Sequence, residues 1–353
     1  MMIKENPKIE IFSYLSSYRN LLFYFLNFTR YSRIYKRINK MPSIDEVPLT
    51  WVNIEFSLFV FGEVMAFPCY IFVLYHLLAT KNARQLIPNH AIVIMLVFNW
   101  IHLSIDLSMT TNFLRLRYVS PFHPILCGLQ QFVDYGIWYG AIFIMLWISI
   151  ERHIVIFHSS LIRTTRSCLI FHYLPLIVFT LYAPSLYFYL IVLYPCERLY
   201  DDRYNLCGGV CFYTTISSWY IWYESTVNYV IPILLIVVLS FALLVRVFLQ
   251  KRRLQRNVEW HRHWKMIIQF IIICLMYLIF DLPYIIIMII QWAGIRNFGN
   301  SFASPYITHL TYVPAIVLPF ATLVTLPDVT KKFHALFIWK KNHRNIVPTT
   351  VNI

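Results

Sequence analysis

Charged side chains are scarce in this sequence. Only 13% of its 353 residues are charged, whereas 59% are hydrophobic, and a typical soluble domain carries about 25% charged residues. A chain with so few charges cannot cover a water-facing surface or stay disordered in water, so both of those classes are excluded. Its seven cysteines are also too sparse for a small secreted module held together by disulfides.

Acidic residues are scarcer than basic ones. The chain has 16 Asp and Glu against 30 Lys and Arg, which gives a formal net charge of +14. In a soluble protein such a basic excess would suggest a nucleic-acid partner. In a membrane protein the question is instead which side of the bilayer holds the basic residues. We therefore expect the lipid bilayer, and not nucleic acid, to be a partner of this chain.

Long hydrophobic runs account for the low charge. A helix that spans a bilayer needs about 20 mostly apolar residues, and seven runs meet this length: 54–79, 89–113, 127–157, 167–194, 219–249, 264–292 and 304–326. They show no period-2 alternation, which disfavours a β-barrel, and no long internal repeat, which disfavours an inverted-repeat transporter. The sequence predicts an all-α membrane protein with a bundle of seven transmembrane helices.

The two ends of the chain differ from these runs. Residues 1–50 contain eight Lys and Arg, and Asn27 begins an Asn-Phe-Thr triplet that fits the acceptor pattern for glycosylation. After Pro327, residues 329–339 form an amphipathic stretch that suits a short eighth helix on the membrane surface. We divide the chain into an N-terminal segment (1–50), a transmembrane domain (51–327) and a tail with the eighth helix (328–353).

The distribution of basic residues indicates the orientation in the membrane. With the N-terminus outside, the inner connections and the tail collect 17 Lys and Arg, whereas the three outer loops hold five. The positive-inside rule therefore favours an extracellular N-terminal segment and a cytoplasmic tail. The eight basic residues of 1–50 argue for the opposite orientation, but long flanking segments contribute weakly to topology.

This orientation places four cysteines on the oxidising side of the membrane, where disulfides persist. Cys127 opens the third span, and the other three lie in the loop after the fourth span: Cys196, Cys207 and Cys211. The remaining cysteines fall within or at the ends of spans. We expect these to be free thiols: Cys69, Cys168 and Cys274.

The third span ends in the triplet Glu151-Arg152-His153, and Arg152 follows Cys127 by 25 residues. Together with seven spans and cysteines in the next outer loop, this spacing resembles the rhodopsin-like (class A) G-protein-coupled receptors. The resemblance implies a multi-pass plasma-membrane receptor that binds an extracellular ligand and activates a heterotrimeric G protein, with no enzymatic activity and no cofactor. It also implies that Arg152 contacts the G protein after activation. An arginine at this depth is costly unless paired, and Glu151 is its neighbouring counter-charge.

Several positions depart from the family's pattern. Asn99 and Leu318 stand where many members have the acidic or amide residues that hold sodium, so we predict no sodium site of that type. Asp281 replaces the aromatic toggle of the sixth helix, and its candidate partner is Asn99 or a bound water. His263 occupies the position of an acid that locks the arginine in many members. The chain therefore resembles a divergent member.

The resemblance further implies that one cysteine of the loop after the fourth span pairs with Cys127. The number of candidates leaves the connectivity open. Cys207 and Cys211 lie nearer to the family's position. We favour Cys211 as the partner, with Cys207 as the alternative, and expect a Cys196–Cys207 bridge within the loop.

Asp134 is the leading candidate for ligand binding. It precedes Arg152 by 18 residues, which is five helical turns or about 27 Å along one face of the third span. A carboxylate at that depth is a functional candidate; the alternative is a structural carboxylate satisfied by a tyrosine or by Gln131. In receptors of the family it resembles, an Asp at this position holds the ammonium group of an amine or of a cationic peptide.

Four other residues complete the predicted pocket. Tyr312 aligns with a tyrosine that hydrogen-bonds this Asp in amine receptors, and Glu224 adds a carboxylate on the facing fifth span. Trp138 and Tyr284 offer aromatic faces to a cation. The resulting ligand hypothesis is a biogenic amine or a cationic neuropeptide.

The alternative function is a non-signalling seven-helix protein, such as a transporter or a decoy receptor. A transporter should show paired broken helices in matching halves, and a metal-dependent enzyme should show His and Asp clusters at helical spacing. We expect no metal site, because the histidines of the spans are scattered: His76, His90, His102, His172 and His309. We interpret the remaining intramembrane acids as elements of conformational coupling, not ligand contacts: Glu63, Asp106 and Asp281.

Overall fold

A computed structural model of the chain describes residues 48–84, 86–158, 164–216, 218–253, 260–292, 298 and 307–325. Within these ranges every regular element is helical, which confirms the predicted all-α class. The glycosylation triplet at Asn27, nearly all of segment 1–50 and the predicted eighth helix in 328–353 lie outside the described residues.

Among the described residues, six helices are long and apolar enough to cross a membrane, and a shorter apolar helix, Thr308–Val324, supplies the seventh. The first four spans are α2 (Leu49–Ala79), α4–η2–α5 (Ile87–His102, Leu103–Leu107, Ser108–Leu116), α6–η3–α7 (Pro124–Phe132, Val133–Ile137, Trp138–Phe157) and α8–η5–α9–η6 (Thr165–Cys168, Leu169–Tyr173, Leu174–Phe188, Tyr189–Leu193). The other three are α11–η8–α12 (Ser218–Tyr223, Glu224–Val230, Ile231–Arg253), α13 (Trp260–Trp292) and η10–α15 (Thr308–Tyr312, Val313–Thr325). Short helical turns connect them: α3 (Lys81–Arg84), η7 (Asn205–Gly208) and α10 (Phe212–Thr215).

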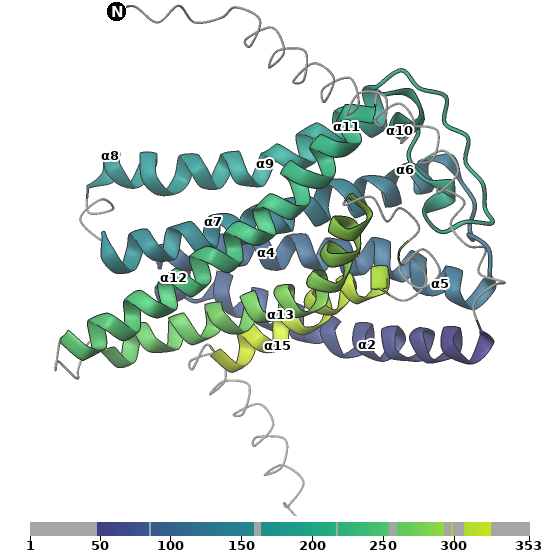
Figure 1. The fold of residues 1–353 in the computed structure, drawn as a ribbon. Coiled ribbons are helices and arrows are strands. Elements are labelled where there is room, and N and C mark those ends of the chain that lie inside the picture. Colours follow the sequence, from purple (N-terminus) through teal and green to yellow (C-terminus); the bar gives the residue numbers. More distant parts are fainter. Residues whose placement is uncertain are drawn as a thin grey trace, which may run out of the picture.

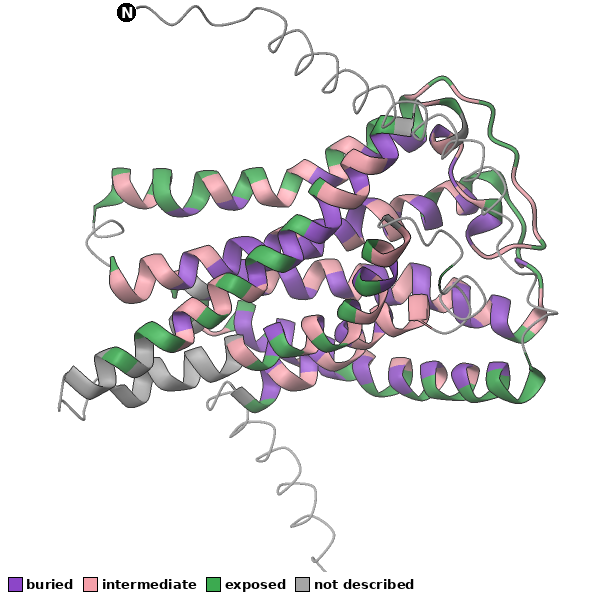
Figure 2. Cartoon of the chain, in the orientation of Figure 1, coloured by how far each residue is buried: buried purple, intermediate pink, exposed green. Residues whose placement is uncertain are grey.

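The third span forms the centre of the bundle (Figure 1). Its helix α7 packs against α4, α9 and α12, while α15 packs against both α13 and α2. In the most apolar part of each span, 61% of the residues of Pro124–Phe157 are buried, against 28% for Thr165–Leu193. Figure 2 shows the same contrast between α7 and α9. The third span is therefore enclosed by protein, whereas the apolar surface of the fourth span suits contact with lipid.

Helices α4 and α7 approach each other closely at Gly140. A Cβ atom at this position would lie 2.6 Å from a ring carbon of Phe98, closer than normal van der Waals contact. Small residues permit such close approach of transmembrane helices, whose association depends on packing more than on the hydrophobic effect. This contact holds the second and third spans side by side, and these two spans carry most of the site described below.

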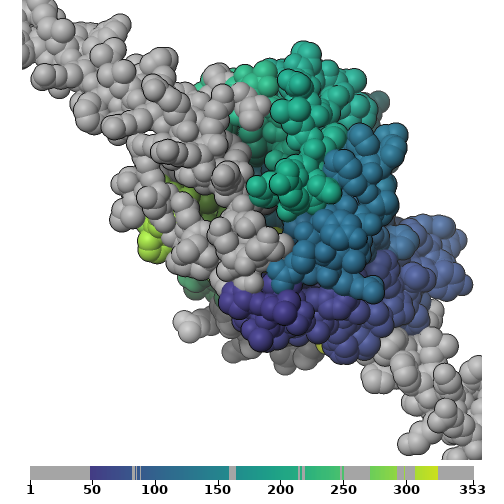
Figure 3. All heavy atoms as spheres, turned by 90° about the vertical axis from the view of Figure 1, so that its right-hand side faces the viewer, coloured from purple at the N-terminus to yellow at the C-terminus, as the bar shows by residue number. Residues whose placement is uncertain are grey.

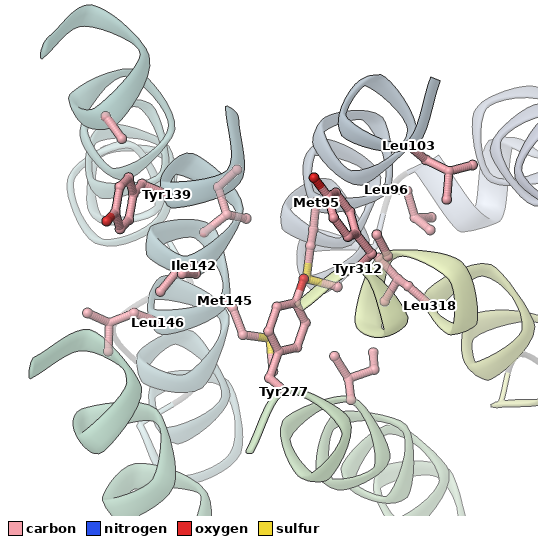
Figure 4. Close-up of a cluster of buried hydrophobic side chains, with 14 of the residues drawn as sticks. Met95, Leu96, Leu103, Tyr139, Ile142, Met145, Leu146, Tyr277, Tyr312 and Leu318 are labelled. Carbon is pink, nitrogen blue, oxygen red and sulfur yellow. The ribbon is translucent and has the colours of Figure 1, made fainter. Parts of the chain in front are cut away.

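An apolar core fills the middle of the bundle. Figure 4 shows side chains from α4, α7, α13 and α15 converging there, among them Met95, Met145 and Leu318. One hydrogen bond also ties the first span to the seventh, because the Tyr70 hydroxyl donates to the carbonyl oxygen of Ala315 at 2.6 Å. This core separates two polar regions at opposite ends of the third span.

The predicted pairing of Asp281 with Asn99 is wrong. The Tyr277 hydroxyl donates to Asn99 Oδ1 at 3.2 Å, and the Asn99 amide donates to the carbonyl oxygen of Met95 at 2.8 Å. Both carboxylate oxygens of Asp281 are buried without a hydrogen-bond partner among the described residues. Because Asn99 is engaged by Tyr277 and by its own helix, it is not left to pair with Asp281.

Two disulfides lie at the end of the bundle where α6 begins, which we call the outer end; Figure 3 looks onto this end. They join Cys127 to Cys207 and Cys196 to Cys211. The favoured Cys127–Cys211 pairing is therefore wrong, as is the Cys196–Cys207 bridge, and the alternative partner Cys207 is correct. The three cysteines expected to be free are free: Cys69, Cys168 and Cys274.

The conformation of the loop explains this pairing. Leu206 and Cys207 both adopt left-handed backbone angles, with φ of 54°, which are uncommon for residues other than glycine. The Gln131 side chain donates to the carbonyl oxygens of Leu206 and Gly209 at 2.9 and 2.8 Å. These bonds hold the turn, and with it the buried Cys207, against the start of the third span. Gln131 therefore binds the loop and is not the partner of Asp134.

Candidate functional site

Asp134 lies in the outer half of the third span, in the π-helical turn η3. Its side chain is half-buried, and it has no hydrogen bond or ion pair with any described residue. A carboxylate oxygen of Asp134, one of Asp106 and a ring nitrogen of His102 all lie within 4.8 Å of one another. Asp134 therefore faces the interior of the bundle and retains its full capacity to accept hydrogen bonds or bind a cation.

Asp106 is the most completely buried member of this group, with 0% of its surface exposed. The Tyr312 hydroxyl donates to its Oδ2 at 2.6 Å, and the Gln130 amide donates to its Oδ1 at 3.2 Å. The sequence predicted that Tyr312 would bond Asp134, and that prediction is wrong. The phenol instead reaches Asp106 on the second span, which leaves Asp134 without this donor.

His102 is the third member of the group and was not selected from the sequence. Its Nε2 lies 3.3 Å from Asp106 Oδ2 but forms no hydrogen bond, although the atom is buried. The ring stacks on that of Tyr312, with centroids 5.2 Å apart. The spacing of His102 and Asp106, four residues on one helix, places both on the same face and could have identified this pair.

Glu224 lies on the fifth span, in the π-helical segment η8. It is buried, accepts a hydrogen bond from the Tyr187 hydroxyl at 2.6 Å and is also hydrogen-bonded to Tyr213. Asp134 is near enough to Glu224 for their charges to interact. In contrast to Asp134, Glu224 already accepts hydrogen bonds from the protein. It is therefore less available than Asp134 to bind a ligand.

Aromatic rings line the same region. The ring of Trp138 lies 5.3 Å from that of Tyr229, and the ring of Tyr284 lies 5.7 Å from Tyr229 on the other side. Tyr229 therefore connects the two aromatic residues predicted to face a ligand. Trp138 also follows Asp134 by about one helical turn, so this aromatic group adjoins the carboxylates.

The outer region gathers three acidic side chains. The carboxylates of Asp106, Asp134 and Glu224 come from three different spans, and each lies in a π-helical turn. Such turns are rare and frequently occur at functional sites. Among the described residues, His102 is the basic side chain in contact with these carboxylates. Buried carboxylates without balancing cations are costly, and a bound cation would remove that cost.

The opposite end of the third span, which we call the inner end, contains Glu151 and Arg152, each only 1% exposed. His172 Nδ1 of the fourth span lies 2.5 Å from a carboxylate oxygen of Glu151. His172 Nε2 is in turn 3.1 Å from His90 Nδ1, and His90 Nε2 is 2.8 Å from the carbonyl oxygen of Arg84. Two histidines thus link Glu151 to the second and fourth spans.

Glu151 and Arg152 form no close ion pair among the described residues, and Glu151 contacts His172, but the two neighbouring charges still interact. The Nε and Nη1 atoms of Arg152 are buried and have no hydrogen-bond partner there. The side chain of His263, at the position of the family's locking acid, lies outside the described residues. Two of the three guanidinium nitrogens therefore lack an acceptor in the described part of the chain.

Comparisons with known proteins identify this architecture. The family of 7 transmembrane receptors (rhodopsin family) matches residues 71–322, more than two thirds of the chain. The fold is similar to the crystal structure of squid rhodopsin, with a TM-score of 0.64 and 17% sequence identity, over 83% of this chain and 87% of that chain. No curated protein matches the sequence. Because the family match covers most of the seven-helix bundle, the chain belongs to the rhodopsin family of seven-transmembrane receptors.

Proposed function

We propose that this rhodopsin-family protein is a plasma-membrane receptor that binds a cationic extracellular ligand, a biogenic amine or a cationic neuropeptide, and activates a heterotrimeric G protein. The observation that carries the proposal is Asp134, a half-buried carboxylate with no partner among the described residues at the outer end of the third span. Toward its other end the same span carries Arg152, whose buried Nε and Nη1 have no hydrogen-bond partner among the described residues.

The electrostatics of the outer end favour a cation over an anion or a neutral ligand. Asp134 is close enough to both Asp106 and Glu224 for electrostatic interaction with each, so three acidic side chains surround the place that a ligand cation would occupy. An ammonium or guanidinium group placed at Asp134 would gain a strong charge-assisted hydrogen bond. Trp138 and Tyr284 flank Tyr229 beside it, and aromatic faces of this kind attract cations.

The inner end supports coupling to a G protein. Arg152 lies 18 residues after Asp134, about 27 Å along an almost continuous helix. A helix of this kind transmits a shift at one end to the other only if it has two discrete arrangements. The contact of Glu151 with His172 defines one arrangement, in which Arg152 is not held by its neighbour.

The test is a signalling assay on the full-length receptor. Cells that express it are screened with cationic amines and short cationic peptides, using a promiscuous G protein as the readout, and an active compound is titrated on Asp134→Asn. Loss of a buried charge partner costs about 2–5 kcal/mol, so we expect potency to fall by roughly 100-fold or more. Unchanged potency for the active compound would refute binding at Asp134.

Glu197→Gln is the matched control, because it makes the same carboxylate-to-amide change in the loop after the fourth span. Glu197 is exposed and is not part of the proposed pocket, so potency should stay within about threefold. Arg152→Gln should retain ligand binding and lose G-protein activation. Binding without activation in the unmodified receptor would instead favour the decoy receptor.

A further inference from the structure

Three side chains with metal-binding donors converge at the outer end. His102 and Asp106 come from the second span and Asp134 from the third, and one donor atom from each lies within 4.8 Å of the other two. His102 and Asp106 are buried and Asp134 is half-buried. The group therefore has two anchored donors from one helix and a third donor that closes the site from a neighbouring helix.

The orphaned histidine nitrogen points to a ligand. His102 is only 2% exposed, and its Nε2 is buried without a hydrogen bond while it faces Asp106 Oδ2 at 3.3 Å. A buried polar atom without a partner is rare in native structures and requires an explanation. Asp134 likewise has no partner among the described residues. A metal ion between the three side chains would satisfy both.

The donor set selects the class of metal. An imidazole nitrogen with two carboxylates suits Zn²⁺ and similar first-row ions, whereas Ca²⁺ and Mg²⁺ prefer oxygen ligands alone. Ligands of tetrahedral zinc lie about 2.0–2.2 Å from the metal and hence about 3.4 Å from one another. The 3.3 Å between His102 and Asp106 already fits. The other donor separations are at most 4.8 Å, so they have to close by no more than about 1.4 Å, which a small rotation of the half-buried aspartate would supply.

The surroundings of Asp106 resemble the outer shell of a metal site. Tyr312 and Gln130 each donate to one of its two oxygens, at 2.6 and 3.2 Å. Hydrogen bonds of this kind orient a carboxylate ligand and increase metal affinity. Three protein donors also leave a fourth tetrahedral position for water or for a ligand atom, as in catalytic zinc sites.

We propose that His102, Asp106 and Asp134 form a binding site for a zinc-type divalent metal ion, with an open position toward the ligand pocket. This differs from the expectation of no metal site, which was based on histidines scattered along the sequence. It also differs from the family's sodium position, because Asn99 there is bonded to Tyr277. A consequence that rests on the proposed function is competition, since a metal and a cationic ligand would both need Asp134.

The proposal is tested by direct binding, without any signalling readout. Full-length receptor is purified in detergent, stripped with a chelator and titrated with Zn²⁺ by calorimetry, and Co²⁺ is used as a spectroscopic substitute whose visible absorption reports four-coordinate geometry. We expect saturable binding of one ion. His102→Ala and Asp134→Asn should each weaken it by about 100-fold or more.

Two further variants make the result specific. Asp134→His replaces one zinc ligand by another, so it should bind Zn²⁺ within about tenfold of the unmodified receptor, whereas a cationic ligand would lose its carboxylate. His123→Asn removes an exposed histidine at the start of α6, and its Zn²⁺ affinity should not change. Lack of saturable binding, or binding that persists in both His102→Ala and Asp134→Asn, would overturn the metal site without bearing on G-protein signalling.

Discussion

The two ends of the third span carry ionisable side chains of opposite type, and at each end one such side chain has atoms without a hydrogen-bond partner among the described residues. At the outer end, Asp134 is a half-buried acid without a partner among the described residues. At the inner end, Arg152 is a buried base whose Nε and Nη1 have none there. Under the proposed function, each end therefore receives a partner of the opposite charge from its own side of the bundle, and one helix connects the two.

The ends differ in how their remaining acids are held. Tyrosine hydroxyls donate to Asp106 and Glu224 at the outer end, both at 2.6 Å. At the inner end, imidazole rings hold Glu151 and pass the contact on to a second helix. Each hydroxyl is itself bonded further, because Asn228 Nδ2 donates to the Tyr187 oxygen at 3.4 Å and Thr110 Oγ1 lies 3.4 Å from that of Tyr312. The acids of the outer end are thus held by phenols and the acid of the inner end by imidazoles, and both sets of contacts reach a neighbouring span.

Loss of the Cys127–Cys207 disulfide, which fixes the loop to the outer end of the third span, should have the largest effect on the protein. The Cys127–Cys207 bond spans 80 residues and the Cys196–Cys211 bond spans 15, for which chain entropy alone gives about 4.5 and 3 kcal/mol. We expect Cys207→Ser to abolish display at the cell surface and Cys196→Ser to reduce it less. Labelling of surface protein, normalised to total receptor, measures both.

A double variant controls for mispairing. Cys127→Ser combined with Cys207→Ser leaves no new free thiol at the outer end, and it should reproduce the loss seen with Cys207→Ser alone. Equal losses of surface display for Cys196→Ser and Cys207→Ser would mean that the bond to the third span contributes no more than the bond within the loop.

Removing the contact between His172 and Glu151 at the inner end should have the next largest effect on the protein. His172→Phe keeps a ring of similar size but leaves Glu151 buried without its contact at 2.5 Å. Removal of one member of a buried charged pair costs about 3–5 kcal/mol, so the thermal unfolding temperature of the detergent-purified receptor should fall clearly. Adding Glu151→Gln to this variant should recover part of the loss, because the amide is less costly to bury.

The measurement is a double-mutant cycle on unfolding temperature, which isolates the coupling between the two residues. Tyr173→Phe is a useful control, since it alters a neighbouring ring without touching Glu151. If the effects of His172→Phe and Glu151→Gln simply add, the contact between them does not stabilise the inner end and its role as a link between helices is refuted.

The fold was predictable because it depends on hydrophobicity and spacing. The seven apolar runs and the 25 residues from Cys127 to Arg152 were sufficient to predict the seven-helix bundle and the family. Both are properties that persist whatever the detailed side-chain contacts are. The position of Asp134 inside the bundle was also predictable, because an acid in an apolar span is costly unless it faces protein.

The contacts within the site were less predictable, for two physical reasons. Counting at 3.6 residues per turn fails at π-helical turns, which insert a residue and rotate the following face; Asp106 and Asp134 both lie in such turns. That rotation is consistent with Tyr312 bonding Asp106 instead of Asp134. The correct disulfide depended on left-handed angles at Leu206 and Cys207, which these residue types do not favour and residue order does not reveal.

The smallest effect, and the sharpest test of the charge at the outer end, comes from two tyrosines. Tyr312→Phe removes the donor to the Asp106 carboxylate, whereas Tyr277→Phe removes a donor to the neutral amide oxygen of Asn99. Hydrogen bonds to charged groups contribute about 1.5–3 kcal/mol and neutral ones about 0.5–1.5 kcal/mol. We therefore expect Tyr312→Phe to lower the unfolding temperature of the ligand-free receptor about twice as much as Tyr277→Phe. Phenylalanine keeps both rings, including the stack of residue 312 on His102, so the comparison measures the hydroxyls. Equal losses would indicate that the bond from Tyr312 to Asp106 is no stronger than a bond to a neutral amide, and the proposed attraction of the outer end for cations would then depend on Asp134 and Glu224 alone.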